Sequence, residues 1–253
     1  MRQVLKDQQV GLDPKFRYRG MSQTRIETFS DTAFALAITL LVLSSSVPET
    51  FAELKASMRN IIPFMLCIVL ITVIWYQHYI FFLRYGLQNA VTVILNVALL
   101  CLILVYVYPL KYLMRFLTEF YAALFSQNFQ SLQSQFGDLL DSSGEGNMQY
   151  LMVVYGLGVV LIFGTIALMY FHAYKLRRHL DLNDYEQFST KASLIMNLLQ
   201  SGVAMLSVLI AATGIFGSLH SATVSGFTYF LYPIVLPLAA RRLKKRERML
   251  FPE

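Results

Sequence analysis

Two titratable side chains, Asp31 and His78, stand at the edges of long apolar stretches in this chain of 253 residues. An ionised side chain near hydrocarbon costs at least ~2.5 kcal/mol unless it finds a partner. A carboxylate and an imidazole in such positions could relay protons, as intramembrane ionisable groups often do. They could equally fix one helix against another. In either case both side chains need polar partners close by.

Six apolar spans carry or flank these residues, and each is long enough to cross about 30 Å of hydrocarbon as a helix. They cover residues 29–47, 61–83, 90–117, 148–171, 192–215 and 219–239. The composition is 56% hydrophobic and 14% charged, which exceeds the apolar content of ordinary soluble domains, about 45–50%. The prediction is an all-α integral membrane protein with six transmembrane helices. Residues 48–60 predict a short interfacial helix, and residues 125–147 either a mobile loop or a short amphipathic piece.

The distribution of basic residues predicts the orientation. With the N-terminus in the cytosol, 17 of the 21 Lys and Arg residues fall on the cytosolic side, as the positive-inside rule requires. We therefore expect two cytosolic termini, with a basic arm over 1–24, a membrane domain over 25–240 and a basic tail over 241–253. These basic residues form no nucleic-acid-binding motif. Cys67 and Cys101 lie inside spans and suggest neither a disulfide nor a metal site, so no cofactor is expected.

Polar residues of three spans are predicted at the same depth. Ser30 and Asp31 begin the first span, Trp75 and His78 come near the cytosolic end of the second, and Asn96 follows about two turns into the third. One interpretation is a hydrogen-bonded cluster that satisfies every polar group. The alternative is a set of separate interfacial residues, since Trp and His are common at span ends.

The first span also carries an uncharged stripe. Thr32, Leu36, Thr39 and Leu43 follow the spacing i, i+4, i+7, i+11 and share one helix face. Any Leu-rich membrane helix can produce such a stripe, so alone it indicates no function. The chain lacks the Thr-Val-Gly-Tyr-Gly filter of the usual potassium channels. It also lacks an Arg-rich voltage sensor, a nucleotide-binding Gly loop and a His-Glu-x-x-His metal motif.

The motif Arg25-x-x-x-Phe29-Ser30-Asp31 opens the first span, and with six spans the chain resembles prokaryotic members of the transmembrane-protein-175 family of potassium channels. The resemblance extends to the Trp75 and His78 region of the second span and to Asn96 in the third. From spacing alone, Arg25 either pairs with Glu27 or the Asp31 neighbourhood, or marks the inner boundary of the membrane.

The resemblance implies a potassium-permeable channel, not an enzyme, in the inner (plasma) membrane of a prokaryote. One copy of the six-span unit implies a homotetramer, with four first helices around a central pore. Leu36 would then be an apolar constriction or gate, Leu43 an outer apolar ring, and Thr39 a hydroxyl that meets potassium ions transiently. The outer mouth would be lined by Ser44, Ser45 and Ser46. The first helix would be fixed by a polar network of Arg25, Phe29, Ser30, Asp31, Trp75, His78 and Asn96.

Two other functions stay open at this point. One is a proton-coupled secondary transporter or proton leak pathway in which Asp31 and His78 titrate. The other is a membrane-embedded enzyme built on the same two residues, for which the chain offers no nucleophile or metal set.

Overall fold

A computed structural model describes residues 13–43, 48–59, 61–140, 147–215 and 217–252, and every regular element in these ranges is a helix. Five long helices are α1 (Arg25–Leu43), α3 (Ile61–Tyr85), α4 (Ala90–Ser126), α6 (Asn147–Lys175) and α7 (Asp184–Thr213). A sixth span combines α8 (Ser218–Thr228), the 3₁₀ turn η2 (Tyr229–Leu231) and α9 (Tyr232–Leu250). The prediction of six helices long and apolar enough to cross a membrane is confirmed.

Two short helices lie between the spans. The interfacial helix predicted within residues 48–60 corresponds to α2 (Phe51–Arg59). In the 125–147 segment the structure contains α5 (Gln130–Leu140), so the helical interpretation describes this part better than a loop. The tail expected after residue 240 is helical as well, because α9 continues without a break to Leu250.

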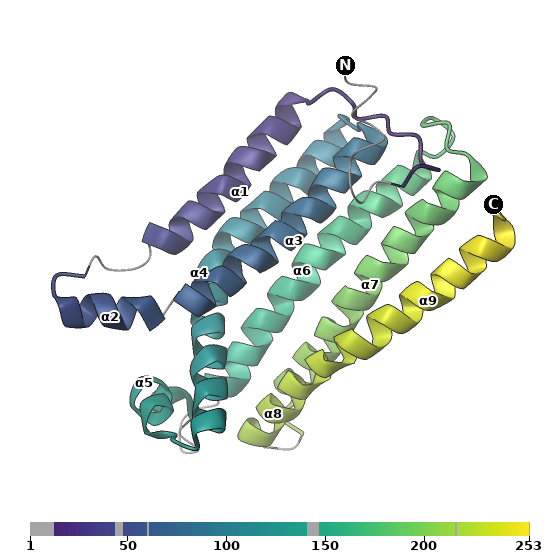
Figure 1. Cartoon of the computed structure of the whole chain (residues 1–253). Coiled ribbons are helices and arrows are strands. Elements are labelled where there is room, and N and C mark those ends of the chain that lie inside the picture. The colour runs from purple at the N-terminus through teal and green to yellow at the C-terminus, as the bar shows by residue number, and fades with distance from the viewer. Residues whose placement is uncertain (1–12, 44–47, 60, 141–146, 216, 253) are drawn as a thin grey trace.

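The helix α4 is longer than a bilayer is thick. Its 37 residues span about 55 Å at 1.5 Å per residue, against about 30 Å of hydrocarbon. The overhang forms a small separate core with α5, in which Phe116 packs against Leu132 and Phe136. Figure 1 shows α5 folded beside the lower end of α4, at the end of the bundle opposite the start of α1.

Local capping signals decide where α1 and α4 begin. A capping box starts α1: the Thr24 N–H donates to Glu27 Oε2 at 2.7 Å, and the Glu27 N–H donates to Thr24 Oγ1 at 3.3 Å. At the start of α4, the Asn89 side chain accepts from the Thr92 N–H at 2.9 Å. These caps fix the residues at which the two helices begin.

The bundle has two parts that meet between α4 and α6. The helix α4 contacts α1, α3 and α6, whereas α6 packs along α7, which in turn carries α8 and α9. Buried aromatic rings fill the junction, where Tyr170 of α6 packs edge-on against Phe81 and Tyr85 of α3. Among the described elements, α1 contacts α3 and α4 only, and it lies at the edge of the bundle (Figure 1).

The described part of the N-terminal arm, residues 13–24, is attached to the bundle. The Gly20 N–H donates to the Leu83 carbonyl at 3.0 Å, and a Cβ on Gly20 would lie 2.1 Å from the Phe82 carbonyl oxygen, so only glycine fits there. The Arg19 side chain then reaches Glu186 at the start of α7 with a distance of 2.7 Å between Nη2 and Oε2. This segment therefore links the end of α3 to the start of α7.

Candidate functional site: the first span and its polar support

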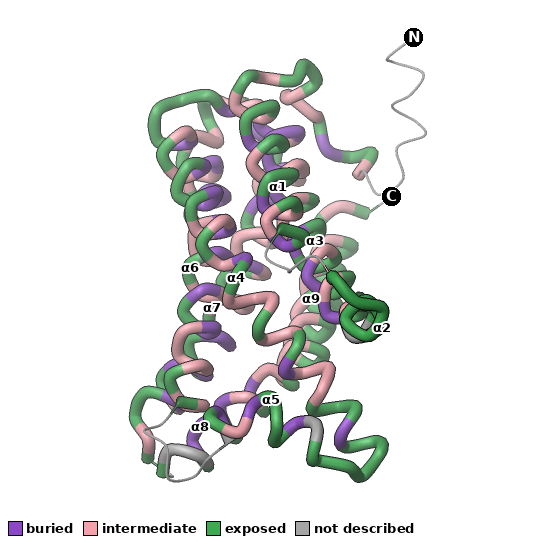
Figure 2. The backbone as a smooth tube through the Cα atoms, turned by 90° about the vertical axis from the view of Figure 1, so that its left-hand side faces the viewer, coloured by how far each residue is buried: buried purple, intermediate pink, exposed green. Residues whose placement is uncertain are grey.

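The helix α1 has two opposite faces. Its buried residues are Ser30, Phe34, Ala37 and Leu41. Its exposed residues include Thr32, Leu36, Thr39 and Leu43. The two sets have the same spacing and are offset by two residues, which is about 200° around the helix. One face thus packs on α3 and α4, while the uncharged stripe is left open, with Leu36 49% and Leu43 72% exposed (Figure 2).

A chain of hydrogen bonds holds the buried face in place. The Ser30 hydroxyl donates to the Ile26 carbonyl at 2.8 Å and accepts from Asn96 Nδ2 at 2.9 Å. The amide oxygen of Asn96 lies 2.7 Å from His78 Nε2. All three side chains are at most 2% exposed. Side chains from α1, α4 and α3 therefore meet in one buried network.

The direction of these bonds follows from the Ser30 hydroxyl. Its hydrogen is used on the Ile26 carbonyl, so it must accept from Asn96, which turns the amide oxygen of Asn96 toward His78. His78 then has to donate from Nε2. The ring is enclosed by Phe34 and Phe82, with centroid distances of 5.5 and 4.7 Å. This surrounding suits a neutral imidazole that acts as a fixed donor.

Asp31 takes part in a second connection between α1 and α3, separate from the Ser30 network. The indole N–H of Trp75 donates to Asp31 Oδ1 at 2.8 Å, and Gln23 Nε2 donates to Oδ2 at 3.4 Å. Asp31 is exposed, whereas His78 is buried. Within the described residues no hydrogen bond joins Asp31 to the His78 network. The single cluster considered from spacing is thus two separate links between α1 and its neighbours.

The far end of α1 is held by a lysine that sequence reasoning did not single out. Lys111 Nζ of α4 donates to the carbonyl of Leu41 at 3.0 Å. The last turn of α1 contains no basic residue of its own, so Lys111 supplies the positive charge that the carbonyl end of a helix favours. A charged residue inside an apolar span usually has a specific polar partner. The position of Lys111 within the third span could therefore have indicated a contact of this kind.

Thr39 is the exposed hydroxyl that follows Leu36 on the stripe, and its hydrogen bond is defined. Thr39 Oγ1 donates to the Ala35 carbonyl of its own helix at 2.9 Å. Since its hydrogen is used inside the helix, the oxygen lone pairs are what Thr39 offers to its surroundings. Such an oxygen can accept from water or coordinate a cation.

The remaining motif residues take different positions. Phe29 is 62% exposed, next to the stripe and away from the buried face. The described ion pairs are Arg17 with Asp181 and Arg19 with Glu186, and neither includes Arg25. Glu27, the possible partner of Arg25, serves in the capping box. The serines at 44–46 lie outside the described residues.

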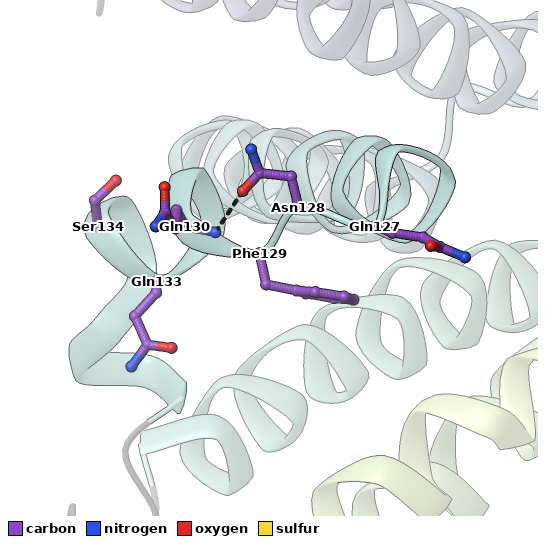
Figure 3. A pocket seen from close by; sticks show the side chains of 6 residues that line it. All are labelled: Gln127, Asn128, Phe129, Gln130, Gln133 and Ser134. Atoms are coloured by element: carbon purple, nitrogen blue, oxygen red, sulfur yellow. Dashed lines mark hydrogen bonds between the residues drawn. The ribbon is translucent and has the colours of Figure 1, made fainter.

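A surface depression lies at the end of the bundle opposite the start of α1, away from this network (Figure 1). It has a volume of about 730 Å³ and is lined by Gln127, Asn128, Phe129, Gln130, Gln133 and Ser134, at the turn between α4 and α5 (Figure 3). Asn128 Oδ1 accepts from the Gln130 N–H at 3.1 Å, which begins α5. Its lining offers amide and hydroxyl groups but no charged side chain.

Comparisons with known proteins agree with this geometry. A family model described as "Endosomal/lysosomal potassium channel TMEM175" matches residues 25–109, the range that includes α1, α3 and the polar residues of α4. A "Potassium channel" of Marivirga tractuosa is 54% identical over 242 residues, which cover 95% of this chain and 96% of that protein. A solved structure of the potassium channel MtTMEM175, a threonine-to-alanine variant in complex with a nanobody-MBP fusion protein, matches with a TM-score of 0.84 and 53% identity. That match covers 93% of this chain and 100% of the other.

The fold and the site define a six-span helical membrane protein in which polar side chains lock one face of the first span and leave an uncharged face open. The chain belongs to the TMEM175 family of potassium channels and is a prokaryotic member of it. The resemblance drawn from the Arg25 to Asp31 motif is confirmed.

Proposed function

We propose that the chain is one subunit of a potassium-preferring channel whose pore is lined by the open face of α1. The observation that carries this proposal is the division of α1 into a buried face with a complete hydrogen-bond network and an opposite face of leucines and hydroxyls. A helix that only faced lipid would not need its rotation fixed so closely.

Assembly around an axis follows from the position of α1. It lies at the edge of the bundle and contacts only α3 and α4 among the described elements. The stripe of a single subunit therefore cannot surround a pore. Several copies must each contribute one α1 face to surround a path. The single six-span unit in this chain supports a homotetramer with a central pore, as the family resemblance implies.

In this arrangement Leu36 forms the narrow apolar constriction and Leu43 an outer apolar ring. A ring of leucines excludes water when it is narrow, and it conducts once it widens enough to wet. Ser44, Ser45 and Ser46 follow Leu43 directly in the sequence, which would place their hydroxyls at the outer mouth.

Selectivity is assigned to Thr39. Four copies of its hydroxyl oxygen, one turn beyond Leu36, would replace part of the water around a passing ion. Potassium loses its water at lower cost than sodium, so a tight and partly hydrated site favours potassium. The discrimination is expected to be modest, because the chain contains no Thr-Val-Gly-Tyr-Gly segment to supply a carbonyl cage.

The polar network is assigned a supporting role. One link of Ser30, Asn96 and His78 and a second link of Asp31 and Trp75 hold α1 at a fixed rotation on α3 and α4, so that the stripe faces the axis. Phe29, which was expected in this network, is 62% exposed and lies away from the buried face, and neither described ion pair includes Arg25. The separation of exposed Asp31 from buried His78 supports this role over a proton relay between them. Both termini are placed in the cytosol of a prokaryotic cell, with the protein in its plasma membrane, because this arrangement puts 17 of 21 Lys and Arg residues inside.

Flux measurements on purified protein in liposomes test the proposal. Potassium should equilibrate faster than sodium without an energy source or a proton gradient. Leu36→Ala should raise conductance or lower the preference for potassium, since the smaller side chain widens the proposed constriction. Val42→Ala is the matched control: Val42 is also exposed on α1 at 54%, but it points about 120° away from Leu36. Equal effects of both substitutions, or saturable proton-coupled uptake of a solute, would contradict the channel assignment.

A further inference from the structure

The end of α9 carries a basic stripe with a fixed direction. Arg241, Lys244, Lys245 and Arg248 are all exposed and together line a surface depression of about 400 Å³ with Met249. At about 100° per residue these four side chains fall within an arc of about 100° on the helix. We call this set the α9 basic face.

The end of α9 is held against α7 by residues outside the α9 basic face. The Tyr185 hydroxyl donates to Glu247 Oε1 at 3.2 Å, and the Phe251 ring packs edge-on against Tyr185 with a centroid distance of 5.4 Å. Phe251 also contacts Phe188, with a centroid distance of 6.0 Å. These contacts prevent free rotation of the helix end, so the α9 basic face is turned away from the bundle.

The charge of this face is not neutralised within the described part of the chain. The ion pairs found there involve Arg17, Arg19, Asp181 and Glu186, and none includes a residue of the α9 basic face. Glu247, the nearest acidic residue in the helix, is turned toward Tyr185. A concave patch with four cations is therefore available to an anionic partner from outside the subunit.

The position of the face along the chain identifies that partner. The last apolar span passes directly into the basic segment, because α9 is continuous from Tyr232 to Leu250. Residues 241–248 thus lie within about 12 Å of the end of the apolar part, the level of lipid headgroups. Met249 and Leu250 add exposed apolar side chains, at 65% and 61%, as in segments that lie at a bilayer surface.

We propose that the α9 basic face binds the phosphate of an anionic phospholipid in the adjacent leaflet. Two guanidinium groups and two ammonium groups around one depression suit a phosphate diester, which arginine can bind with two parallel hydrogen bonds. Basic clusters that directly follow a transmembrane helix attract anionic lipid in this way. The site belongs to this chain's own tail, and it requires neither ion conduction nor a particular number of subunits.

Lipid titration of the purified full-length protein tests this site. Nanodiscs of phosphatidylcholine containing increasing fractions of a fluorescent phosphatidylglycerol would report binding by energy transfer from Trp75, the single tryptophan of the chain. Wild-type protein should enrich phosphatidylglycerol over fluorescent phosphatidylcholine. The variant Lys244→Gln/Arg248→Gln should lower that enrichment about tenfold, since it removes two of the four cations that line the depression and can bond directly to the phosphate.

A matched control separates a defined site from general positive charge. Arg242→Gln/Arg246→Gln removes the same charge from the same helix, but both residues are exposed outside the depression. This control should change the enrichment less than twofold. Equal losses in the two variants, or no preference of the wild type for phosphatidylglycerol, would overturn the proposal. So would stronger binding of a short RNA than of the anionic lipid.

A second double variant of the α9 basic face is needed in case the first variant does not fold. Arg241→Gln/Lys245→Gln removes the other half of the α9 basic face and should reproduce the loss. Helical content and elution volume of each variant would report its folding. Potassium flux of the same preparations, measured separately, distinguishes loss of the lipid site from failure of the channel assignment.

Discussion

Replacing Asn96 with leucine removes the side chain that joins α4 to both α1 and α3. The amide is 1% exposed, and its bonds measure 2.7 Å to His78 and 2.9 Å to Ser30. Ser30 keeps its bond to the Ile26 carbonyl, so it loses little. His78 is left with a buried N–H that has no acceptor, which costs about 1–3 kcal/mol. A lost hydrogen bond between membrane helices averages only about 0.6 kcal/mol, so the unpaired donor should dominate.

Unfolding in mixed micelles of increasing SDS content, followed by Trp75 fluorescence, measures this effect. Trp75 is the single tryptophan and bonds to Asp31 of α1, so it reports on the α1–α3 contact. Asn96→Leu should lower the free energy of unfolding by about 2 kcal/mol. The neighbouring substitution Val97→Leu, on the exposed side of α4, should change it by less than about 0.5 kcal/mol.

A double-mutant cycle tests the reasoning itself. In Asn96→Leu/His78→Leu both polar partners are gone, so no buried donor is left unpaired. The double variant should therefore be more stable than the sum of the single effects predicts, by about 1 kcal/mol or more. Additive effects would show that His78 and Asn96 do not depend on each other, and would refute the unpaired His78 donor as the cause of the destabilisation.

Three further predictions concern other contacts. Thr39→Val should lower the potassium-to-sodium permeability ratio but leave stability nearly unchanged, because the described bond of the hydroxyl is to the Ala35 carbonyl of its own helix; an unaltered ratio would remove Thr39 from the selectivity argument. Lys111→Met should destabilise the last turn of α1 by about 1 kcal/mol and speed its amide hydrogen exchange, whereas Lys111→Arg should preserve protection; equal exchange in both variants would contradict the capping role. Arg19→Met leaves the fully buried Glu186 carboxylate without its cation and should cost roughly 3 kcal/mol in unfolding experiments. Glu186→Gln should cost less, because it leaves no buried charge and its amide oxygen still accepts from one of the two backbone N–H groups that bond to Glu186; the reverse order would exclude this explanation.

The spans could be predicted because each is a local property. Continuous apolar runs of sufficient length predict a membrane helix wherever they occur, and all six are present. Helical spacing also separated the stripe at Leu36 and Thr39 from the buried face of α1. The pore roles of these residues, and of Leu43 and the serines at 44–46, stay predictions.

Contacts between distant segments could not be predicted from spacing. Counting residues from the ends of the spans placed Ser30, Asp31, His78 and Asn96 at one depth in the membrane. This depth does not tell in which direction each side chain points around its helix. Asp31 is one residue, or about 100°, beyond Ser30, which is enough to place it in a separate link with Trp75.

The attachment of the N-terminal arm illustrates the same limit. Asn183 and Glu186 form a capping box that local sequence can reveal. The partner of that glutamate, Arg19, comes 167 residues earlier in the chain, and many exposed basic residues compete for such a role. Only the folded arrangement of α3 and α7 brings the two together.

The central claim is that the open face of α1 lines a pore shared by several subunits. Electron cryomicroscopy of the protein in lipid nanodiscs tests it most directly. Four-fold symmetry is predicted, with Leu36 closest to the axis, Thr39 and Leu43 following along it, and the Ser30 face turned away. A particle in which the Leu36 face of α1 contacts lipid, or in which another helix lines the axis, would contradict it.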